Sequence, residues 1–381
     1  MRLFRIIIPL ILTTTNAFVP TVMRGMFALS PLSATDDDKN LNINETQKLS
    51  TIRAPIKYIG PYPCLALRFP KLATKSMEKN NTGISLDFVM DTAANTNTIN
   101  AQVAAELSLP NVGKAPGGVG AGGVIEGGDT FMLGDCELEG LPAEDKFTFM
   151  SDLTASALPV ASPASAGLLS LTFFNCFEGG VEFCWGKAEG NEMVIPPSIS
   201  FYGPENSDTN PAEGMSRVPI KSIPVTLLPS ITVRVNGVEM PALLDTGSPI
   251  TVMNTQAASE AGVEAFNLDQ PSKSNNPFVT FTNNLKVTKA ISDGNIMQLA
   301  GANAVINLLK SNSKVDVSII GDDGPISFGA GNIFVGDLPG LAALNGLGVD
   351  APPALILGMD VLRTKTKMLY RGQQNEVFFE N

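Results

Sequence analysis

One short pattern occurs twice in this chain, and the repetition constrains the fold more than any other feature of the sequence. An apolar run leads into an Asp-Thr turn over Leu86–Ala93, and a similar run leads into another over Ala242–Gly247. Glycine lets the backbone bend sharply, and a threonine hydroxyl can bond back to the turn. Each pattern therefore predicts a rigid turn that presents one carboxylate.

Other segments repeat in the same order around the two turns. Short helical patterns follow both turns, at residues 101–107 and 255–261. Three further pairs of segments match: 64–69 with 231–235, 131–135 with 333–337, and 167–174 with 355–362. An ordered set of matches of this kind indicates an internal duplication. We therefore predict two related lobes, each presenting one Asp.

The rest of the chain is typical of an all-β protein. Short apolar or alternating runs are separated by clusters of Gly, Pro, Asn and Asp. We place the N-terminal lobe at 55–188 and the C-terminal lobe at 222–381, joined by a Pro- and Ser-rich linker at 189–221. An insertion at about 275–331 has no counterpart of equal length in the first lobe.

Composition excludes several classes of function. The net charge of −11 argues against nucleic acid or an anionic membrane as a partner. The chain contains no histidine, which excludes Ser-His-Asp and Cys-His catalysis and zinc sites built on histidine. Because no tight cluster of oxygen ligands is evident either, we expect no metal. Hydrolytic chemistry would have to come from carboxylates.

The four cysteines, Cys64, Cys136, Cys176 and Cys184, form no C-x-x-C pair. The last two flank a stretch that we interpret as a hairpin turning at Gly179-Gly180. A cross-strand disulfide is one reading of that hairpin. Buried free thiols are the reading that we favour.

The N-terminus has the pattern of a targeting segment. A basic start, an apolar run from Ile6 to Leu12 and a small-residue site ending at Ala17 predict a signal peptide at 1–17, too short for a stable membrane anchor. Residues 18–35 contain no acid, which predicts a transit peptide. The Ala17-Phe18-Val19-Pro20 string resembles bipartite plastid presequences, so we expect import into a plastid, with secretion or an endomembrane location as the alternative. Polar residues 36–54 are expected to be a disordered linker.

The paired motifs resemble those of the aspartic peptidase superfamily. Asp245-Thr246-Gly247 with Leu355-Ile356-Leu357-Gly358 is similar to a complete retropepsin-like copy, and Asp91-Thr92-Ala93 with Leu168-Leu169-Ser170 is similar to an altered one. Two lobes in one chain are similar to the pepsin arrangement. The resemblance implies two acid-protease β-barrel lobes with a cleft between them.

The resemblance also implies an aspartic endopeptidase whose site needs no cofactor. Asp91 and Asp245 would share one proton and activate a water, as the paired carboxylates of aspartic proteases do. The residues that would support this dyad are Thr92, Ala93, Thr246, Gly247 and Ser248.

A glycine-rich stretch lies where a flap over the substrate would fall. The candidate substrate-binding residues there are Gly117, Gly118, Val119 and Gly120. Glycine permits close backbone approach, which suits a mobile lid that bonds a peptide through its main chain. A flexible surface loop is the alternative. Tyrosine is absent from this stretch, so a flap tyrosine of the pepsin type has no counterpart in it.

Four substitutions separate the first copy of the motif from the second, among them Thr172 where Asp360 stands. Ala93 replaces glycine within the family's tolerated pattern, Ala94 lacks the hydroxyl of Ser248, and Ser170 stands where Gly358 stands. A displacement of about 1 Å can cost on the order of 100-fold in rate. The alternative is thus a non-catalytic peptide-binding protein. In either case we expect a polypeptide ligand, a monomer and, for an active dyad, cleavage at mildly acidic pH.

Overall fold

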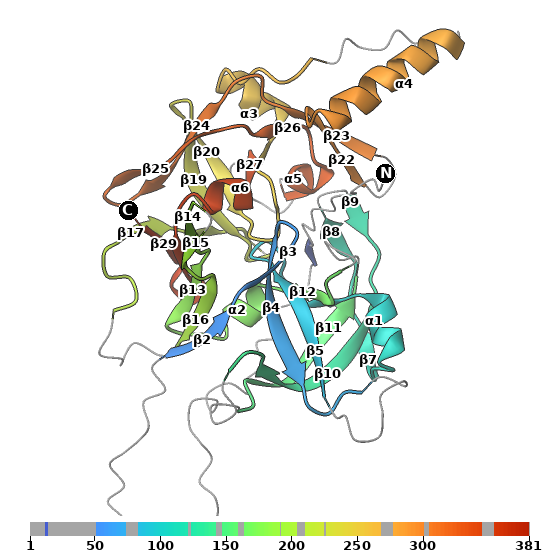
Figure 1. The fold of residues 1–381 in the computed structure, drawn as a ribbon, viewed down its shortest axis with the longest axis vertical. Coiled ribbons are helices and arrows are strands. Elements are labelled where there is room, and N and C mark those ends of the chain that lie inside the picture. Colours follow the sequence, from blue (N-terminus) through green and yellow to red (C-terminus); the bar gives the residue numbers. More distant parts are fainter. Residues whose placement is uncertain are drawn as a thin grey trace, which may run out of the picture.

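The protein consists of two β-rich lobes that share a sheet between them (Figure 1). The computed structural model describes residues 12–13, 51–73, 83–120, 123–141, 147–158, 164–190, 192–203, 210–224, 226–267, 277–300, 305–344 and 354–380. Lobe one is formed mainly from residues 57–169, and lobe two mainly from residues 221–357. The prediction of an all-β, two-lobed protein is confirmed.

Lobe one is built on an eight-stranded sheet in the order β3-β4-β5-β12-β6-β11-β10-β7. Pairing of β10 with β4 as well as with β11 closes its central strands into a barrel. The strands are β3 (Lys57–Ile59), β4 (Tyr62–Phe69), β5 (Ile84–Met90), β6 (Thr98–Ile99), β7 (Asn111–Lys114), β10 (Asp129–Leu138), β11 (Met150–Ala157) and β12 (Gly167–Leu169).

Lobe two is built on a larger sheet in the order β22-β23-β26-β21-β27-β20-β19-β24-β25, with β18 paired to β19. Its strands are β18 (Lys221–Ser222), β19 (Pro229–Val235), β20 (Val238–Leu244), β21 (Val252–Met253), β22 (Ile296–Ala300), β23 (Val305–Lys310), β24 (Val315–Gly321), β25 (Gly324–Gly331), β26 (Phe334–Val335) and β27 (Leu355–Leu357).

A six-stranded sheet in the order β17-β29-β28-β13-β16-β2 lies beside both lobes (Figure 1). Its strands are β2 (Thr51–Pro55), β13 (Gly180–Cys184), β16 (Ser198–Tyr202), β17 (Met215–Pro219), β28 (Lys367–Arg371) and β29 (Glu376–Glu380). β13 follows lobe one and pairs with β28, which follows lobe two. The ends of the two repeats therefore join in one sheet.

The duplication is visible in the strand pairing. In lobe one β5 runs parallel to β12, β12 antiparallel to β6, and β6 parallel to β11. In lobe two β20, β27, β21 and β26 repeat the same three relations. The last three residues of both β5 and β20 are buried, as expected where an apolar run enters a packed core.

Short helices occupy equivalent places in the lobes. α1 (Ala101–Glu106) and α3 (Thr255–Glu260) begin after Asn100 and Asn254, whose side chains accept backbone hydrogen bonds as N-caps. Both helices were predicted. α2 (Leu171–Phe174) and α6 (Met359–Leu362) follow β12 and β27. Lobe two adds α4 (Pro277–Ser292) and α5 (Pro339–Leu344), and a 3₁₀ turn, η4 (Gly372–Gln374), links β28 to β29.

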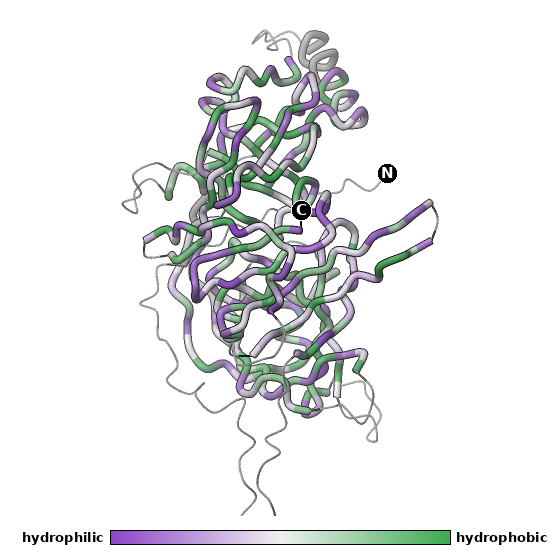
Figure 2. The backbone as a smooth tube through the Cα atoms, turned by 90° about the vertical axis from the view of Figure 1, so that its left-hand side faces the viewer, coloured by the Kyte–Doolittle hydropathy of each residue, from purple (hydrophilic) through white to green (hydrophobic). Residues whose placement is uncertain are grey.

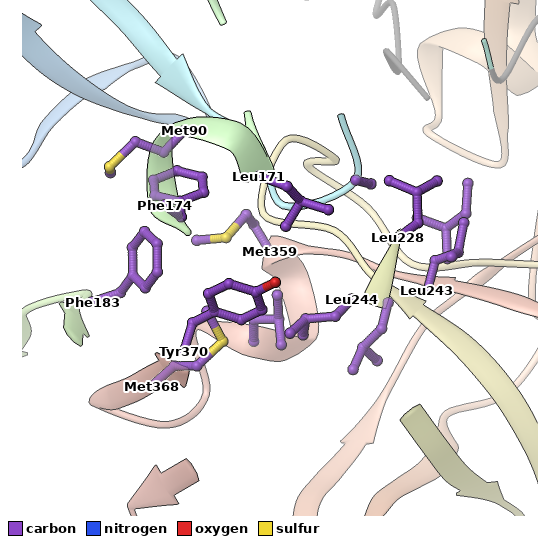
Figure 3. Packing of buried hydrophobic residues seen from close by; sticks show 14 of the residues in the cluster. Met90, Leu171, Phe174, Phe183, Leu228, Leu243, Leu244, Met359, Met368 and Tyr370 are labelled. Carbon is purple, nitrogen blue, oxygen red and sulfur yellow. The ribbon is translucent and has the colours of Figure 1, made fainter. Parts of the chain in front are cut away.

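One large hydrophobic core continues from lobe one through the shared sheet into lobe two. Met90 and Leu244, which precede the two Asp residues, belong to this core together with Tyr370 of β28 (Figure 3). Hydrophobic and hydrophilic residues alternate along much of the chain in both lobes (Figure 2). Because the residues next to both Asp turns pack into one core, the turns cannot shift independently without disturbing it.

Two boundaries differ from the prediction. The linker predicted at 189–221 contains β16 and β17, which pair within the six-stranded sheet, besides the β14 (Lys187–Glu189) and β15 (Glu192–Ile195) hairpin. The segment predicted to be disordered at 36–54 ends in β2, which pairs with β16. β2 and β16 are each five residues long, and they pair with each other from distant parts of the sequence. Local composition therefore gave no signal for them.

Two smaller interpretations are wrong. Cys176 and Cys184 do not flank a hairpin, because Cys176 lies after α2, where its thiol donates to the Thr172 carbonyl. The favoured reading of free thiols is confirmed, since all four cysteines are free and only Cys176 is partly exposed. Residues 131–135 match 333–337 in sequence only. Residues 131–135 lie on β10, which pairs with β4 as β24 pairs with β19 in lobe two. Residues 333–337 include β26, which occupies the place of β11 instead.

The targeting prediction lies almost wholly outside the described residues. Only β1 (Leu12–Thr13) of that region is described, and it pairs antiparallel with β8 (Gly118–Gly120). Within the described part of the chain, no helix combines the length and the apolar character needed to cross a bilayer.

Candidate active site

The two Asp residues lie at equivalent ends of equivalent strands. Asp91 follows β5, and its backbone N–H donates to the Leu169 carbonyl over 2.9 Å. Asp245 follows β20, and its N–H donates to the Leu357 carbonyl over 3.1 Å. Each Asp therefore extends the parallel pairing of its strand by one residue, and both side chains are fully buried.

The threonines that follow the Asp residues bind the two lobes to each other. The Thr92 hydroxyl donates to the Leu244 carbonyl over 2.6 Å and accepts from the Thr246 N–H over 3.1 Å. The Thr246 hydroxyl donates to the Met90 carbonyl over 2.8 Å and accepts from the Thr92 N–H over 3.1 Å. These reciprocal bonds hold the two Asp turns against each other.

We expect Thr92→Val to lower the free energy of unfolding by about 1–3 kcal/mol, because the Leu244 carbonyl and the Thr246 N–H lose their partner in a buried place. The matched control is Thr98→Val in the same lobe, since the Thr98 hydroxyl is buried without a hydrogen-bond partner among the described residues. That control should be neutral or stabilising. Equal losses in the two variants, measured by urea unfolding, would contradict the role given to Thr92.

The carboxylates are arranged alike. Oδ1 of Asp91 accepts from the Ala93 N–H over 2.8 Å, and Oδ1 of Asp245 accepts from the Ser248 N–H over 2.8 Å. Oδ2 of each is buried and has no hydrogen-bond partner among the described residues. These two oxygens therefore keep their hydrogen-bonding capacity unused among the described residues.

Gly247 shows how closely the turns approach. A Cβ atom placed on Gly247 would lie 2.5 Å from Oδ2 of Asp91 and closer still to its Cγ. The carboxylate of lobe one thus lies directly on the backbone of the turn in lobe two. Only glycine leaves room for it.

Burial of the two carboxyl groups raises both pKa values, because a low-dielectric interior disfavours the charged form. The pKa of Asp245 is raised from 3.8 to about 7, against the opposing effect of the Ser248 and Gly247 N–H groups. The pKa of Asp91 is raised well above 3.8, first by burial and then by the charge of Asp245. A single ionisation of the pair is thus favoured around neutral pH.

The first lobe tolerates the substitutions that distinguish its motif. Ser170 has the same extended backbone as Gly358, and its hydroxyl bonds to Asn97 and Thr172. Leu171 donates to the Ala94 carbonyl over 2.9 Å, much as Met359 donates to the Ser248 carbonyl over 2.8 Å. Ser170 therefore leaves this contact of the Asp91 turn in place.

The hydroxyl of Ser248 does not serve the carboxylates. It donates to the Ile250 carbonyl over 2.7 Å, so only its N–H contacts Asp245. Ala94 has no hydroxyl. The predicted asymmetry between the lobes at this position is therefore small, because in neither lobe does a hydroxyl from this position bond to the dyad.

The predicted flap forms a hairpin. β8 pairs antiparallel with β9 (Gly123–Ile125), with Val119 opposite Val124. Gly117 lies at its base, where a Cβ would come within 2.8 Å of the Ile125 carbonyl. α5 of lobe two lies against both strands, so the hairpin of lobe one reaches the other lobe (Figure 1).

One residue near the site was missed by sequence reasoning. Tyr62, at the start of β4, is only 5% exposed, and the charge of Asp245 contributes to raising its pKa. The sequence places Tyr62 far from either Asp motif. Its proximity comes from the pairing of β4 with β5, which the duplicated pattern indicated without specifying the register.

The described residues contain no group of three or more His, Cys, Asp or Glu side chains placed to hold a metal ion.

Comparison with known protein families finds a match in lobe two. Residues 231–361 match the family model of the aspartyl protease, a range that includes Asp245 and the whole of β27. Over those residues the chain is similar to the aspartyl protease family. The predicted resemblance is confirmed, and lobe one, outside the matched range, repeats the strand pairing of the matched lobe.

Solved structures with a similar fold include basic 7S globulin from soybean and conglutin gamma, a basic 7S globulin from lupine seeds. The soybean protein is 12% identical, with a TM-score of 0.40, and the lupine protein is 13% identical, with a TM-score of 0.45. Each comparison covers 87% of this chain and 95% of the other. No curated protein sequence matches the chain.

Proposed function

We propose that this protein is an aspartic endopeptidase whose dyad is Asp91 and Asp245. The observation that carries the proposal is the reciprocal bonding of Thr92 and Thr246, which holds two buried carboxylates together with both Oδ2 atoms unpartnered among the described residues. Structural need alone does not account for two such carboxyl groups, because burying them raises their pKa values and costs stability.

The chemistry follows from a single shared ionisation. The ionised member of the pair acts as general base on a water between the two Oδ2 atoms, and the protonated member polarises the scissile carbonyl and later protonates the leaving amine. Because the pair titrates as a unit, the charge belongs to the dyad as a whole. β9 is an edge strand of the β1-β8-β9 sheet, and an extended substrate would pair with that edge.

The pH dependence should differ from the mildly acidic activity expected from the sequence. The general base must be ionised, and the pKa of Asp245 is about 7, so kcat/KM should rise with pH through about 7. It should fall again where the dyad loses its second proton. We therefore expect an optimum near or slightly above neutral pH.

The experiment is cleavage of an unstructured protein by the purified full chain between pH 4 and pH 9, with and without a statine-type peptide. Cleavage that rises toward neutral pH and is blocked by the statine group supports the proposal. An optimum below pH 5 would contradict the raised pKa values, and turnover unaffected by the statine peptide would contradict the dyad.

The second candidate is a peptide-binding protein without turnover. It is favoured by the absence of any hydroxyl bond from Ala94 or Ser248 to the carboxylates, which leaves the ionised dyad with fewer donors. In that case the full chain would bind the statine peptide and extended peptides in calorimetry, and the substrate protein would remain intact at every pH.

A further inference from the structure

The loop that follows Asp245 is held at both of its ends by the start of α6. At one end, the Ser248 N–H donates to Oδ1 of Asp245, and the Ser248 carbonyl accepts the Met359 N–H over 2.8 Å. At the other end, the Thr251 hydroxyl accepts the Gly358 N–H over 3.0 Å. The position of Ser248 on the carboxylate therefore depends on how this loop is fixed to α6.

Asp360, in the first turn of α6, strengthens the second of these connections. Its Oδ2 accepts the Thr251 N–H over 2.9 Å, and its Oδ1 accepts the Thr251 hydroxyl over 2.7 Å and the Val361 N–H over 2.9 Å. Each contact brings a donor to the carboxylate, which suits the ionised form and makes these bonds stronger than bonds between neutral groups. Because Thr251 is fully buried, loss of Asp360 would leave its N–H without an acceptor in the interior.

Close packing links Thr251 to Ser248 along the loop. A Cβ placed on Gly358 would lie 2.2 Å from the Ile250 carbonyl oxygen, so the start of α6 lies directly on the backbone of the loop. The same Ile250 carbonyl accepts the Ser248 hydroxyl. Interiors packed this closely transmit small shifts, so movement of Thr251 would displace Ile250 and, with it, Ser248.

Lobe one makes the corresponding connection without a charge. Asn97 takes the place of Thr251, six residues after the Asp of its lobe. Its side-chain carbonyl accepts the Ser170 N–H over 3.0 Å and the Ser170 hydroxyl over 3.1 Å. Thr172 stands where Asp360 stands, and its hydroxyl bonds to the Ser170 hydroxyl over 2.8 Å. Of the two lobes, lobe two thus uses a carboxylate where lobe one uses neutral groups.

We propose that Asp360 is a positioning residue for the dyad, because its carboxylate fixes Thr251 and so keeps the Ser248 N–H on the Asp245 carboxylate. This rests on the proposed peptidase function. The Ser248 N–H opposes the upward shift that burial imposes on the pKa of Asp245, so a relaxed loop would raise that pKa further. The charge of Asp245 also raises the pKa values of Asp91, its partner in the dyad, and of Tyr62, which stays protonated between pH 4 and pH 9.

The test compares Asp360→Asn and Thr251→Val with the control Asp337→Asn in the full chain. Asp337 makes the same kind of contact in the same lobe, since its carboxylate accepts the Thr255 N–H over 3.0 Å and the Thr255 hydroxyl over 2.9 Å. That contact fixes the start of α3 instead of the loop after Asp245. The measurements are kcat and KM against pH, titration of isotope-labelled aspartate carboxyl groups by NMR, and thermal unfolding.

We expect Asp360→Asn to reduce kcat on the order of tenfold with little change in KM, because its amide N–H₂ would face the Thr251 N–H and a shift of less than about 1 Å at the dyad is enough for such a loss. Thr251→Val should act in the same direction, since it removes the hydroxyl that joins Asp360 to the Gly358 N–H. In both variants the acidic limb of kcat/KM and the titration midpoint of the dyad should move to higher pH. Asp337→Asn should lose thermal stability and keep the kcat and the titration of the wild type.

Two results would overturn the proposal. One is a wild-type carboxyl titration and pH profile in Asp360→Asn, whatever its thermal stability, which would make Asp360 a purely structural residue. The other is an equal change of kcat and titration in Asp337→Asn, which would show that any such contact in lobe two has the same effect. If Asp360→Asn does not fold, Thr251→Val decides between the same outcomes.

A wild-type protein that cleaves nothing would refute the peptidase function and still leave the role of Asp360 testable, because the carboxyl titration needs no turnover. A titration midpoint of the dyad that rises in Asp360→Asn and stays in place in Asp337→Asn supports the positioning role. Equal midpoints in the wild type and Asp360→Asn refute it.

Discussion

Asp91→Asn and Asp245→Asn should each reduce peptide cleavage by about a thousandfold or more, since either change removes the shared ionisation on which general acid–base catalysis depends. Asparagine has nearly the shape of aspartate and can still accept the Ala93 or Ser248 N–H through its carbonyl oxygen. The loss should therefore appear in kcat, with binding of a statine-type peptide largely retained. The matched control is Asp323→Asn, an exposed carboxylate between β24 and β25.

The same variants should alter the dependence of stability on pH. The pKa of Asp245 is about 7 in the folded protein against an ordinary value of 3.8, so the folded state holds a proton that the unfolded state has lost over that interval. Stability is then greatest below about pH 4 and falls as pH rises through about 7. Asp245→Asn removes this fall, so its stability relative to the wild type should increase with pH.

Urea unfolding at pH 4, 6 and 8 measures this difference independently of activity. A relative stability of Asp245→Asn that stays constant over this range would show that the carboxyl is not held protonated. Full cleavage by both single variants would show that the dyad has been assigned to the wrong residues.

Gly247→Ala should abolish most activity without removing any functional group. The added methyl would lie 2.5 Å from Oδ2 of Asp91, so the carboxylate or the whole lobe-two turn must move. A displacement of about 1 Å at the reacting groups costs on the order of 100-fold in rate. We also expect a loss of about 1–3 kcal/mol in unfolding free energy from overpacking.

Gly331→Ala is the control for this substitution. It lies on β25 of the same lobe, and a Cβ there meets no atom within 4 Å. Its activity and stability should match the wild type. Wild-type kcat/KM in Gly247→Ala would mean that the Asp91 carboxylate does not lie against the lobe-two turn in the working protein.

The duplicated motif could be recognised because it depends on local chemistry. Each lobe contains an apolar run, an Asp-Thr turn and a later second apolar run. The two apolar runs pair as parallel strands in both lobes, which agrees with the predicted duplication. The helices after the two turns were also predictable, since Asn100 and Asn254 cap them through their own side chains.

Other features depend on partners that are distant in sequence. β16 lies in a stretch rich in Pro, Ser and Asn, and it forms a strand because β13 and β2 pair with it on either side. The hydroxyl of Ser248 was expected to serve the dyad, but the Ile250 carbonyl, two residues on, takes its proton. The Ser170 side chain fits because Asn97 and Thr172 accommodate its hydroxyl.

Residue type and local spacing are enough to predict the two related lobes, the two Asp turns and the exclusion of histidine chemistry. The tertiary structure alone decided how the turns meet. Burial raises the pKa values of both carboxyl groups, and the register of β4 against β5 places Tyr62 on the strands that lead to Asp91. Burial and register are set by long-range packing, which no local pattern encodes.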